Sequence, residues 1–138
     1  MLPSSHVVAS SIIGVFVWSH FKSIDYAIVS FIAGTFIDLD HVIDYYLNHS
    51  FTLKVRKIYY ACLKMNLKKV YLVLHSYEII IILWYLIYAM PLGNFWKAVA
   101  IGLTQHLIFD QITNPLNIYG YFMTYRIVKG FKKELLLQ

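Results

Sequence analysis

Histidines and carboxylates occur in closely spaced pairs along an otherwise apolar chain. His106 and Asp110 are four residues apart, and His75 and Glu78 are three residues apart. On a helix, both spacings place the two side chains on one face, about 5–6 Å apart between their Cβ atoms. Metal sites in the cores of helical bundles are built from such pairs. The two pairs therefore predict ligands for a metal ion.

A third group of possible ligands lies in the segment Asp-Leu-Asp-His, which contains Asp38, Asp40 and His41. Asp38 and His41 share a face if the helix continues, whereas Asp40 points elsewhere unless the backbone opens there. Two carboxylates at the C-terminal end of a helix oppose the helix dipole, and a cation would offset that charge. His6 adds a possible ligand near the N-terminus, and Asp44 is a weaker candidate one turn after Asp40.

The types of these residues limit the metal and the chemistry. Mixed imidazole and carboxylate ligands suit zinc, manganese or iron, and the single cysteine, Cys62, argues against a thiolate site. Eight candidates exceed the four ligands of one structural zinc, so we expect two ions, or one ion with additional orienting or acid–base residues. A divalent metal can lower the pKa of a bound water to about 7. Asp40 or Glu78 is expected to orient that water or take its proton. The expected metal ligands are His6, Asp38, Asp40, His41, His75, Glu78, His106 and Asp110.

Simpler structural roles compete with metal binding at each position. His75 and Glu78 could form a hydrogen-bonded pair at the start of a helix, and His106 and Asp110 could form a buried ion pair. His6 could be an interfacial histidine near the terminus. The metal hypothesis therefore requires that all of these side chains meet in space.

The composition predicts a membrane protein with one domain, residues 1–138. Of the residues, 59% are hydrophobic and only 14% are charged, and the mean hydropathy is +0.61. Soluble domains of this size are far less apolar. The net charge of +5 does not indicate nucleic-acid binding, because the basic residues flank apolar runs, where they would meet anionic lipid headgroups.

Four apolar stretches predict an all-α fold, an integral membrane bundle of four helices. They cover residues 7–21, 24–37, 71–90 and 95–110, and Asn114 with Pro115 is expected to end the last one. The first two stretches reach only a little over about 20 Å, which is less than the ~30 Å hydrocarbon core. These two must extend further, thin the bilayer or lie partly in its interface.

Basic residues predict the orientation of this bundle. Residues 54–69 contain six Lys and Arg residues and no acid, interleaved with Tyr59, Tyr60 and Leu63, which is typical of a basic amphipathic helix on a membrane surface. The tail after Asp110 is also basic. By the positive-inside rule, both termini and the long loop lie in the cytoplasm of a multi-pass protein of the cell (inner) membrane, in contact with anionic headgroups. The candidate ligands then all fall at the cytoplasmic ends of the helices.

An ordered set of motifs resembles a known family. An N-terminal His, then GTFIDLDH, LHSYE and GLTQHLIFDQITNP, resembles the YdjM family of bacterial and archaeal membrane-bound metal-dependent hydrolases. That family is similar to the zinc-dependent phospholipase C fold, an all-α enzyme with His-x-x-x-Asp and His-x-x-x-Glu metal motifs. The resemblance covers residues 6–115 and implies a zinc-type hydrolase of phosphoester bonds. The residues it implies in metal-binding roles are His6, Asp38, Asp40, His41, His75, His106 and Asp110. Glu78 departs from the pattern, because it follows His75 by three residues instead of four.

We therefore expect a membrane-bound, metal-dependent hydrolase of a phosphoester in a lipid or lipid-linked substrate, with its site at headgroup depth. Two other functions fit the same residues. A metal ion or proton transporter is one, since intramembrane His and Asp residues also form relays. A non-catalytic membrane subunit, in which a metal only ties the helix ends together, is the other.

Overall fold

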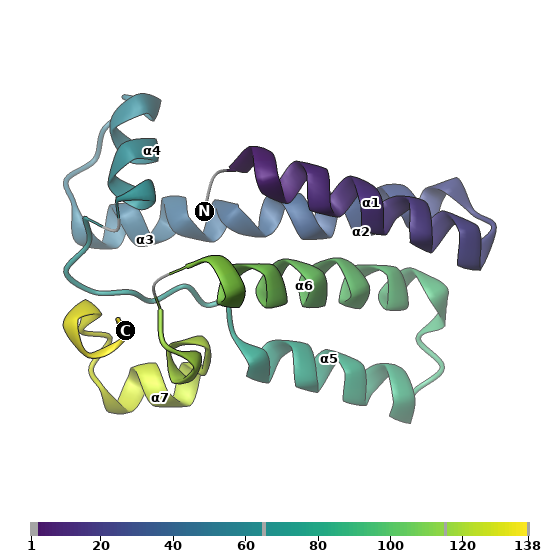
Figure 1. The fold of residues 1–138 in the computed structure, drawn as a ribbon. Helices are drawn as coiled ribbons and strands as arrows, with labels where there is room; N and C mark the ends of the chain where they lie inside the picture. Colours follow the sequence, from purple (N-terminus) through teal and green to yellow (C-terminus); the bar gives the residue numbers. More distant parts are fainter. Residues whose placement is uncertain (1–2, 65, 115, 138) are drawn as a thin grey trace.

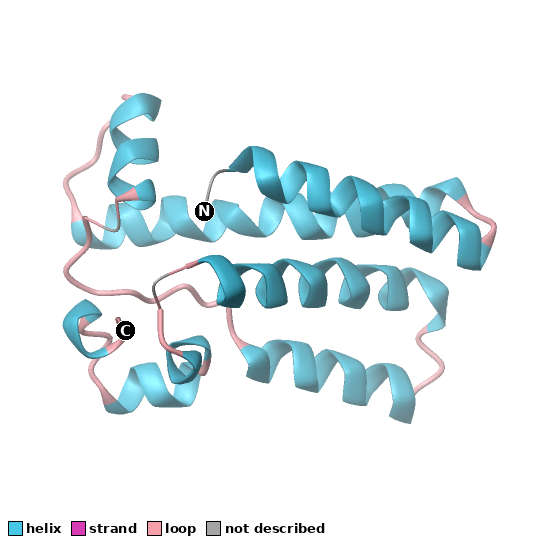
Figure 2. Ribbon diagram, viewed as in Figure 1, coloured by secondary structure: helices cyan, strands magenta, loops and turns pink. Residues whose placement is uncertain are grey.

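The computed structural model describes residues 3–64, 66–114 and 116–137, and every regular element in these ranges is a helix (Figure 2). The predicted all-α class is confirmed. The α-helices are α1 (Pro3–Phe21), α2 (Ile24–Phe36), α3 (Asp40–Asn48), α4 (Val55–Leu63), α5 (Tyr77–Ala89), α6 (Gly93–Thr113) and α7 (Met123–Val128). Three short 3-10 helices are η1 (Ile37–Leu39), η2 (Ile118–Tyr121) and η3 (Lys133–Leu135).

Two helical hairpins form the body of the molecule (Figure 1). The first pairs α1 with α2, and the second pairs α5 with α6. Helix α6 packs against both α1 and α2, whereas α5 packs on α6 alone among the larger helix contacts. As a result, α6 is the central element. It ends at Thr113, just before Asn114, as expected. Pro115 lies outside the described residues.

Two predicted helix boundaries need correction. The second apolar stretch does not end near residue 37, because η1 tightens the chain and α3 continues it to Asn48. No Gly or Pro occurs in residues 35–48 to stop it. The third helix begins at Tyr77 and not at residue 71. Residues 70–75 form a loop, in which the backbone N–H groups of Val70, Tyr71 and Leu74 donate to other parts of the chain.

By length and composition, residues 24–48 form the one helical run in the described part of the chain that is able to cross a membrane. Its 25 residues reach about 37 Å. Helix α5 is apolar, but its 13 residues reach only about 20 Å. The structure thus confirms that the helices form a bundle. It does not confirm that four of them cross a membrane.

Helices α2 and α6 meet at two glycines. A Cβ atom on Gly102 would lie 2.3 Å from the Ser30 carbonyl oxygen, and one on Gly34 would lie 3.1 Å from the Gly102 carbonyl oxygen. Small residues allow helix backbones to approach closely in this way. Ser10 of α1 joins the contact by donating a hydrogen bond to Gln105 Oε1 at 3.1 Å. The glycine contact brings the C-terminal half of α6 against the end of α2.

The C-terminal tail folds back onto the loop before α5 and completes the core there. Val70 N donates to the Phe131 carbonyl at 2.9 Å, and Lys133 N donates to the Lys68 carbonyl at 3.2 Å. The apolar core at this end consists of Val70, Leu72, Ile80, Leu107, Leu116, Tyr121 and Leu136. The tail is therefore a structural partner of the loop that precedes α5.

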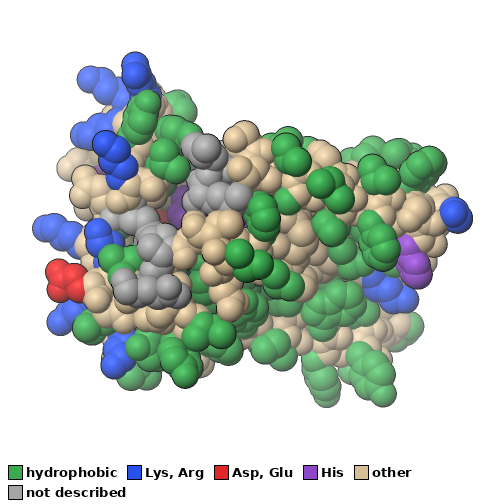
Figure 3. All heavy atoms as spheres, in the orientation of Figure 1, with side chains coloured by type: hydrophobic (Ala, Val, Ile, Leu, Met, Phe, Trp, Pro, Cys, Tyr) green, Lys and Arg blue, Asp and Glu red, His purple; other side chains and the backbone are tan. Residues whose placement is uncertain are grey.

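The outer faces of the hairpins carry large apolar side chains, whereas Lys and Arg gather over α4 and the C-terminal segment (Figure 3). Soluble monomers rarely expose continuous apolar surfaces of this size. The exposed side chains include Val8, Ile12, Val15 and Phe16 of α1, Ile28 and Ile32 of α2, Ile81, Ile82 and Tyr85 of α5, and Ile108 and Ile112 of α6.

Substitution of Gly102 by Ala tests the close contact of α2 and α6. The added methyl group would overlap the Ser30 carbonyl, so we expect the free energy of unfolding to fall by about 1–3 kcal/mol. Gly14→Ala is the matched control, because its Cβ would meet no atom closer than 3.4 Å. Thermal unfolding in nanodiscs measures both. Equal stability of the two variants would show that α2 and α6 do not meet at this glycine.

Candidate metal centre

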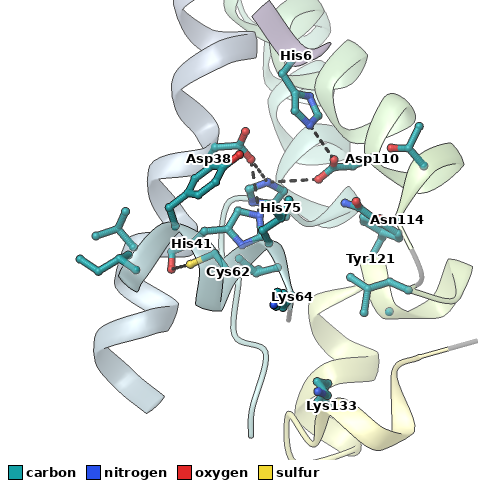
Figure 4. A pocket seen from close by; sticks show the side chains of 18 of the residues that line it. His6, Asp38, His41, Cys62, Lys64, His75, Asp110, Asn114, Tyr121 and Lys133 are labelled. Carbon is teal, nitrogen blue, oxygen red and sulfur yellow. Dashed lines mark hydrogen bonds and ion pairs between the residues drawn. The ribbon is translucent and has the colours of Figure 1, made fainter. Parts of the chain in front are cut away.

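Six of the eight predicted ligands converge at one end of the bundle, and Figure 4 shows five of them, all except His106. They come from five separate parts of the chain: the first turns of α1, η1, the start of α3, the loop before α5, and the last turns of α6. The six residues are His6, Asp38, His41, His75, His106 and Asp110. The sequence prediction that these segments meet is thus confirmed for the six.

Asp38 faces three of the histidines. Its Oδ1 atom lies 3.4 Å from His106 Nε2, 3.5 Å from His75 Nε2 and 3.6 Å from His41 Nε2. Asp38 is one of the more exposed members, with 26% of its side chain accessible. It therefore stands between the buried histidines and the outside of the site.

Asp110 occupies the inner side of the cluster. Its Oδ1 atom lies 3.1 Å from His6 Nε2, and its Oδ2 atom lies 3.6 Å from the Nε2 atoms of both His75 and His106. Asp110 and these three histidines are all almost fully buried. Burying a carboxylate in an apolar bundle is costly unless opposite charge or hydrogen bonds compensate it.

The six residues form two overlapping groups of four that could each hold a metal ion. The first group is His6, Asp38, His106 and Asp110, and the second is Asp38, His41, His75 and Asp110. In each group the ligand atoms lie within 4.8 Å of one another. Both groups contain two histidines, and both share the same two carboxylates.

Two observations fit these residues to a metal ion. First, the Nε2 atoms of His75 and His106 are buried without a hydrogen-bond partner. Second, the nitrogen–oxygen separations of 3.1–3.6 Å match two ligands that share one zinc, since bonds of about 2.0–2.1 Å at a tetrahedral angle place the ligand atoms ~3.4 Å apart. His106 Nδ1 lies 2.7 Å from the Gly34 carbonyl oxygen. A hydrogen bond to that carbonyl leaves Nε2 as the unprotonated, ligating nitrogen.

Asp40 lies behind His75 and not in either group of ligands. Its Oδ2 atom accepts a hydrogen bond from Leu74 N at 2.7 Å and lies 3.4 Å from His75 Nδ1. A carboxylate on the far nitrogen of a ligating histidine fixes the orientation of its ring. The expectation that Asp40 binds metal or acts as the catalytic base is therefore corrected: its position is that of a residue that orients His75.

Glu78 also lies outside both groups of ligands. Its carboxylate accepts hydrogen bonds from Met123 N and Thr124 N, each at 2.9 Å, and from the Thr124 hydroxyl at 2.8 Å. It thus satisfies unpaired N–H groups at the start of α7. The expectation that Glu78 is a ligand or base is corrected on this ground, since both of its oxygens are engaged there.

The loop that carries His75 is held from two sides by buried charges. Asp44 accepts hydrogen bonds from Tyr71 N and Leu72 N at 2.9 and 3.3 Å. Arg126 donates to the carbonyls of Tyr71, Leu72 and His75 at 2.5, 2.7 and 2.9 Å. These bonds hold Leu72 at a φ of +39°, which is unusual for a bulky residue. Burial lowers the pKa of Arg126 below its ordinary value.

The role of Arg126 could not be recognised in the sequence. It stands among other cations in a basic tail and resembles them in every local respect. Asp44 was only a weak candidate ligand, and it proves to be a partner of the backbone. Both are buried, at 1% exposure, and this burial separates them from the exposed charges around them.

A cavity of about 900 Å³ opens beside the cluster. Asp38, His41 and His75 lie in its wall, whereas Asp40 and Glu78 are absent from its described lining. Cys62 also lines it and donates to the His41 carbonyl at 3.3 Å (Figure 4). Burial raises the pKa of Cys62 to about 11, so its thiol stays protonated near neutral pH.

Comparison of the chain with models of protein families, with curated proteins and with solved structures gave no match.

Replacing Arg126 by Met tests whether it positions His75. Met keeps the bulk but leaves three buried carbonyls without their donor, so we expect the free energy of unfolding to fall by at least about 2 kcal/mol. Metal affinity should fall roughly 10- to 100-fold, as when a ligand loses its supporting partner. Equilibrium dialysis against zinc measures the affinity. Lys132→Met is the control, because Lys132 is exposed in the same segment. An unchanged affinity in Arg126→Met would exclude the positioning role.

Proposed function

We propose that this protein is a membrane-bound, metal-dependent hydrolase that cleaves a phosphoester bond in a lipid or lipid-linked substrate. The observation that carries the proposal is the pair of ligand groups that share Asp38 and Asp110 beside a large cavity. Shared carboxylates between two histidine pairs suit two divalent ions. Two-metal sites are widespread among enzymes that cleave phosphoesters.

The residues divide into two sets of ligands. His6 and His106 would hold one ion and His41 and His75 the other, with Asp38 and Asp110 common to both. The nitrogen and oxygen donors suit zinc best, with manganese or iron as alternatives. When bound, such ions supply Lewis acidity, which offsets the negative charge that develops on the phosphoryl oxygens and makes water a stronger acid.

The reaction is a hydrolysis at phosphorus. The oxygen of a water molecule forms a new bond to phosphorus while the ester P–O bond breaks, and the proton that the water loses ends on the departing alkoxide, which gives an alcohol and a phosphate. Asp38 and Asp110 both line the cavity, and Asp38 is the more exposed of the two. As a shared ligand on the open side, Asp38 would hold both ions next to the place where the phosphate binds. Asp40 keeps the His75 ring in place throughout.

The surface of the protein supports a position in the membrane. Apolar side chains cover the outer faces of α1, α2, α5 and α6, while cations gather at the end that contains the cluster (Figure 3). Asp38 lies about 21 Å along the helical run that starts at Ile24, and hence in the half of the bundle that carries the cations. Cations favour the cytoplasmic leaflet and its anionic lipids. We therefore place the site at the cytoplasmic headgroups, with both hairpins in the bilayer.

Metal content tests the two ligand groups. We expect two zinc ions per chain in protein purified with zinc, measured by elemental analysis. His41→Ala removes a ligand from one group only and should leave one ion, whereas Asp110→Ala removes a shared ligand and should leave none. His20→Ala is the control, since His20 lies at the opposite end of α1. A wild-type protein with a single ion would rule out the two-metal arrangement.

Turnover of a small phosphoester tests the hydrolase itself. Methyl 4-nitrophenyl phosphate with zinc-loaded protein should release 4-nitrophenol, and Asp38→Asn should lower kcat/KM at least about 100-fold, because it removes the anionic ligand that both ions share. Asp25→Asn makes the same chemical change at an exposed site at the start of α2 and should have no effect. If the wild-type protein binds metal tightly but cleaves neither this ester nor any class of lipid, the metal has a structural role and the proposed hydrolase function is refuted.

A further inference from the structure

The cavity beside the metal ligands is larger than a phosphate requires. Its volume of about 900 Å³ lies within the ~300–1,000 Å³ range of sites that enclose a whole small-molecule ligand. Its lining is mainly apolar, although it includes Asp38, His41 and Asp110. A cavity of this kind matches a ligand with one polar end and one bulky apolar end.

Residues 51–64, which comprise α4 and the residues before it and are called the α4 segment below, supply much of the apolar wall. Leu53 and Val55 line the cavity although they are 79% and 76% exposed, so they lie at its mouth. Ile58 is buried at 8% exposure and lies deeper. Leu63 also lines the cavity and is partly buried. In the structure, the α4 segment packs on α3 and projects from the body of the bundle (Figure 1).

Cations flank the apolar mouth. Lys54, Arg56 and Lys57 are exposed next to Leu53 and Val55, and Lys64 lines the cavity at the other end of α4 (Figure 4). An apolar opening bordered by positive charge favours an anionic amphiphile over a neutral lipid or a free phosphate.

We propose that the cavity encloses the apolar group of a single-chain phosphoester, with the phosphate at Asp38 and His41 and the chain along the α4 segment. The identification of the ligand as a phosphoester depends on the proposed hydrolase function. The chain leaves the bilayer and enters the protein, where Leu63 is one of the apolar residues that it contacts. The substrate class is thus an anionic amphiphile with one apolar chain, cleaved at its phosphate.

A series of alkyl 4-nitrophenyl phosphates tests the proposal, with methyl, butyl and octyl esters used below their micelle concentrations on zinc-loaded protein in nanodiscs. Cleavage adds water at phosphorus and releases 4-nitrophenol from each. For wild type, kcat/KM should rise by roughly three- to fourfold for each methylene group that enters the cavity. Leu63→Trp fills part of the cavity and should lower the octyl-to-methyl ratio of kcat/KM at least about tenfold, with the methyl ester unaffected. Leu47→Trp is the matched control, because Leu47 is 60% exposed on α3 and outside the described lining.

Calorimetric titration with alkylphosphonates of the same lengths gives a second measurement that needs no turnover, with empty nanodiscs as the blank. Affinity that rises with chain length in wild type and Leu47→Trp, but not in Leu63→Trp, supports the chain site even if no ester is cleaved. Binding that depends on chain length without any cleavage would refute the proposed hydrolase function, but it would support the cavity as a binding site for an amphiphile. Hydrolysis with the same chain-length dependence in all three proteins would show that the chain stays in the bilayer and would overturn the inference. Binding that does not depend on chain length would also overturn it.

Discussion

The contact between α2 and α6 at Gly34 and Gly102 positions the two helix ends that carry Asp38 and His106. Two helix backbones approach so closely there that one methyl group on Gly102 would overlap the Ser30 carbonyl. The same approach places the Gly34 carbonyl 2.7 Å from His106 Nδ1. It also allows Asp38, just beyond the end of α2, to face His106 of α6 at 3.4 Å. The packing of small residues thus determines the geometry of a charged cluster that lies one turn further along.

The cluster itself is built in layers around two aspartates. Asp38 and Asp110 face the histidine nitrogens, while Asp40 lies behind the His75 ring on its other side. Arg126 and Asp44 hold the backbone of the loop that carries His75. Buried polar groups rigidify a structure when all of their partners are present and are costly when one is missing. This explains why residues from the tail take part in a site whose ligands come from elsewhere in the chain.

Two kinds of surface meet at this end of the bundle. Apolar side chains cover the helical hairpins, and cations gather on α4 and the C-terminal segment (Figure 3). The cavity lies at the junction between them, with a mainly apolar lining that includes metal-binding residues. An amphiphile has the same division between a charged end and an apolar end. The metal-binding residues, the apolar cavity and the basic surface around it are therefore each suited to an anionic amphiphile.

The sequence by itself determined the helical class, the apolar segments and a set of eight candidate ligands that includes the six of the cluster, because hydropathy, residue type and spacing are local properties. The motifs GTFIDLDH and GLTQHLIFDQITNP could also be recognised in the sequence. The sequence did not show that Gly34 of the first motif and Gly102 of the second form the contact of α2 and α6. Only the tertiary structure decided between ligands and supporting residues. Asp40 and Glu78 have the right chemistry and spacing for ligands, yet one orients His75 and the other caps α7. Arg126 is one cation among several in the sequence, and only packing buries it. Spacing along a helix determines which side chains share a face, whereas depth and partners depend on segments far away in the chain, so these roles could be assigned only in three dimensions.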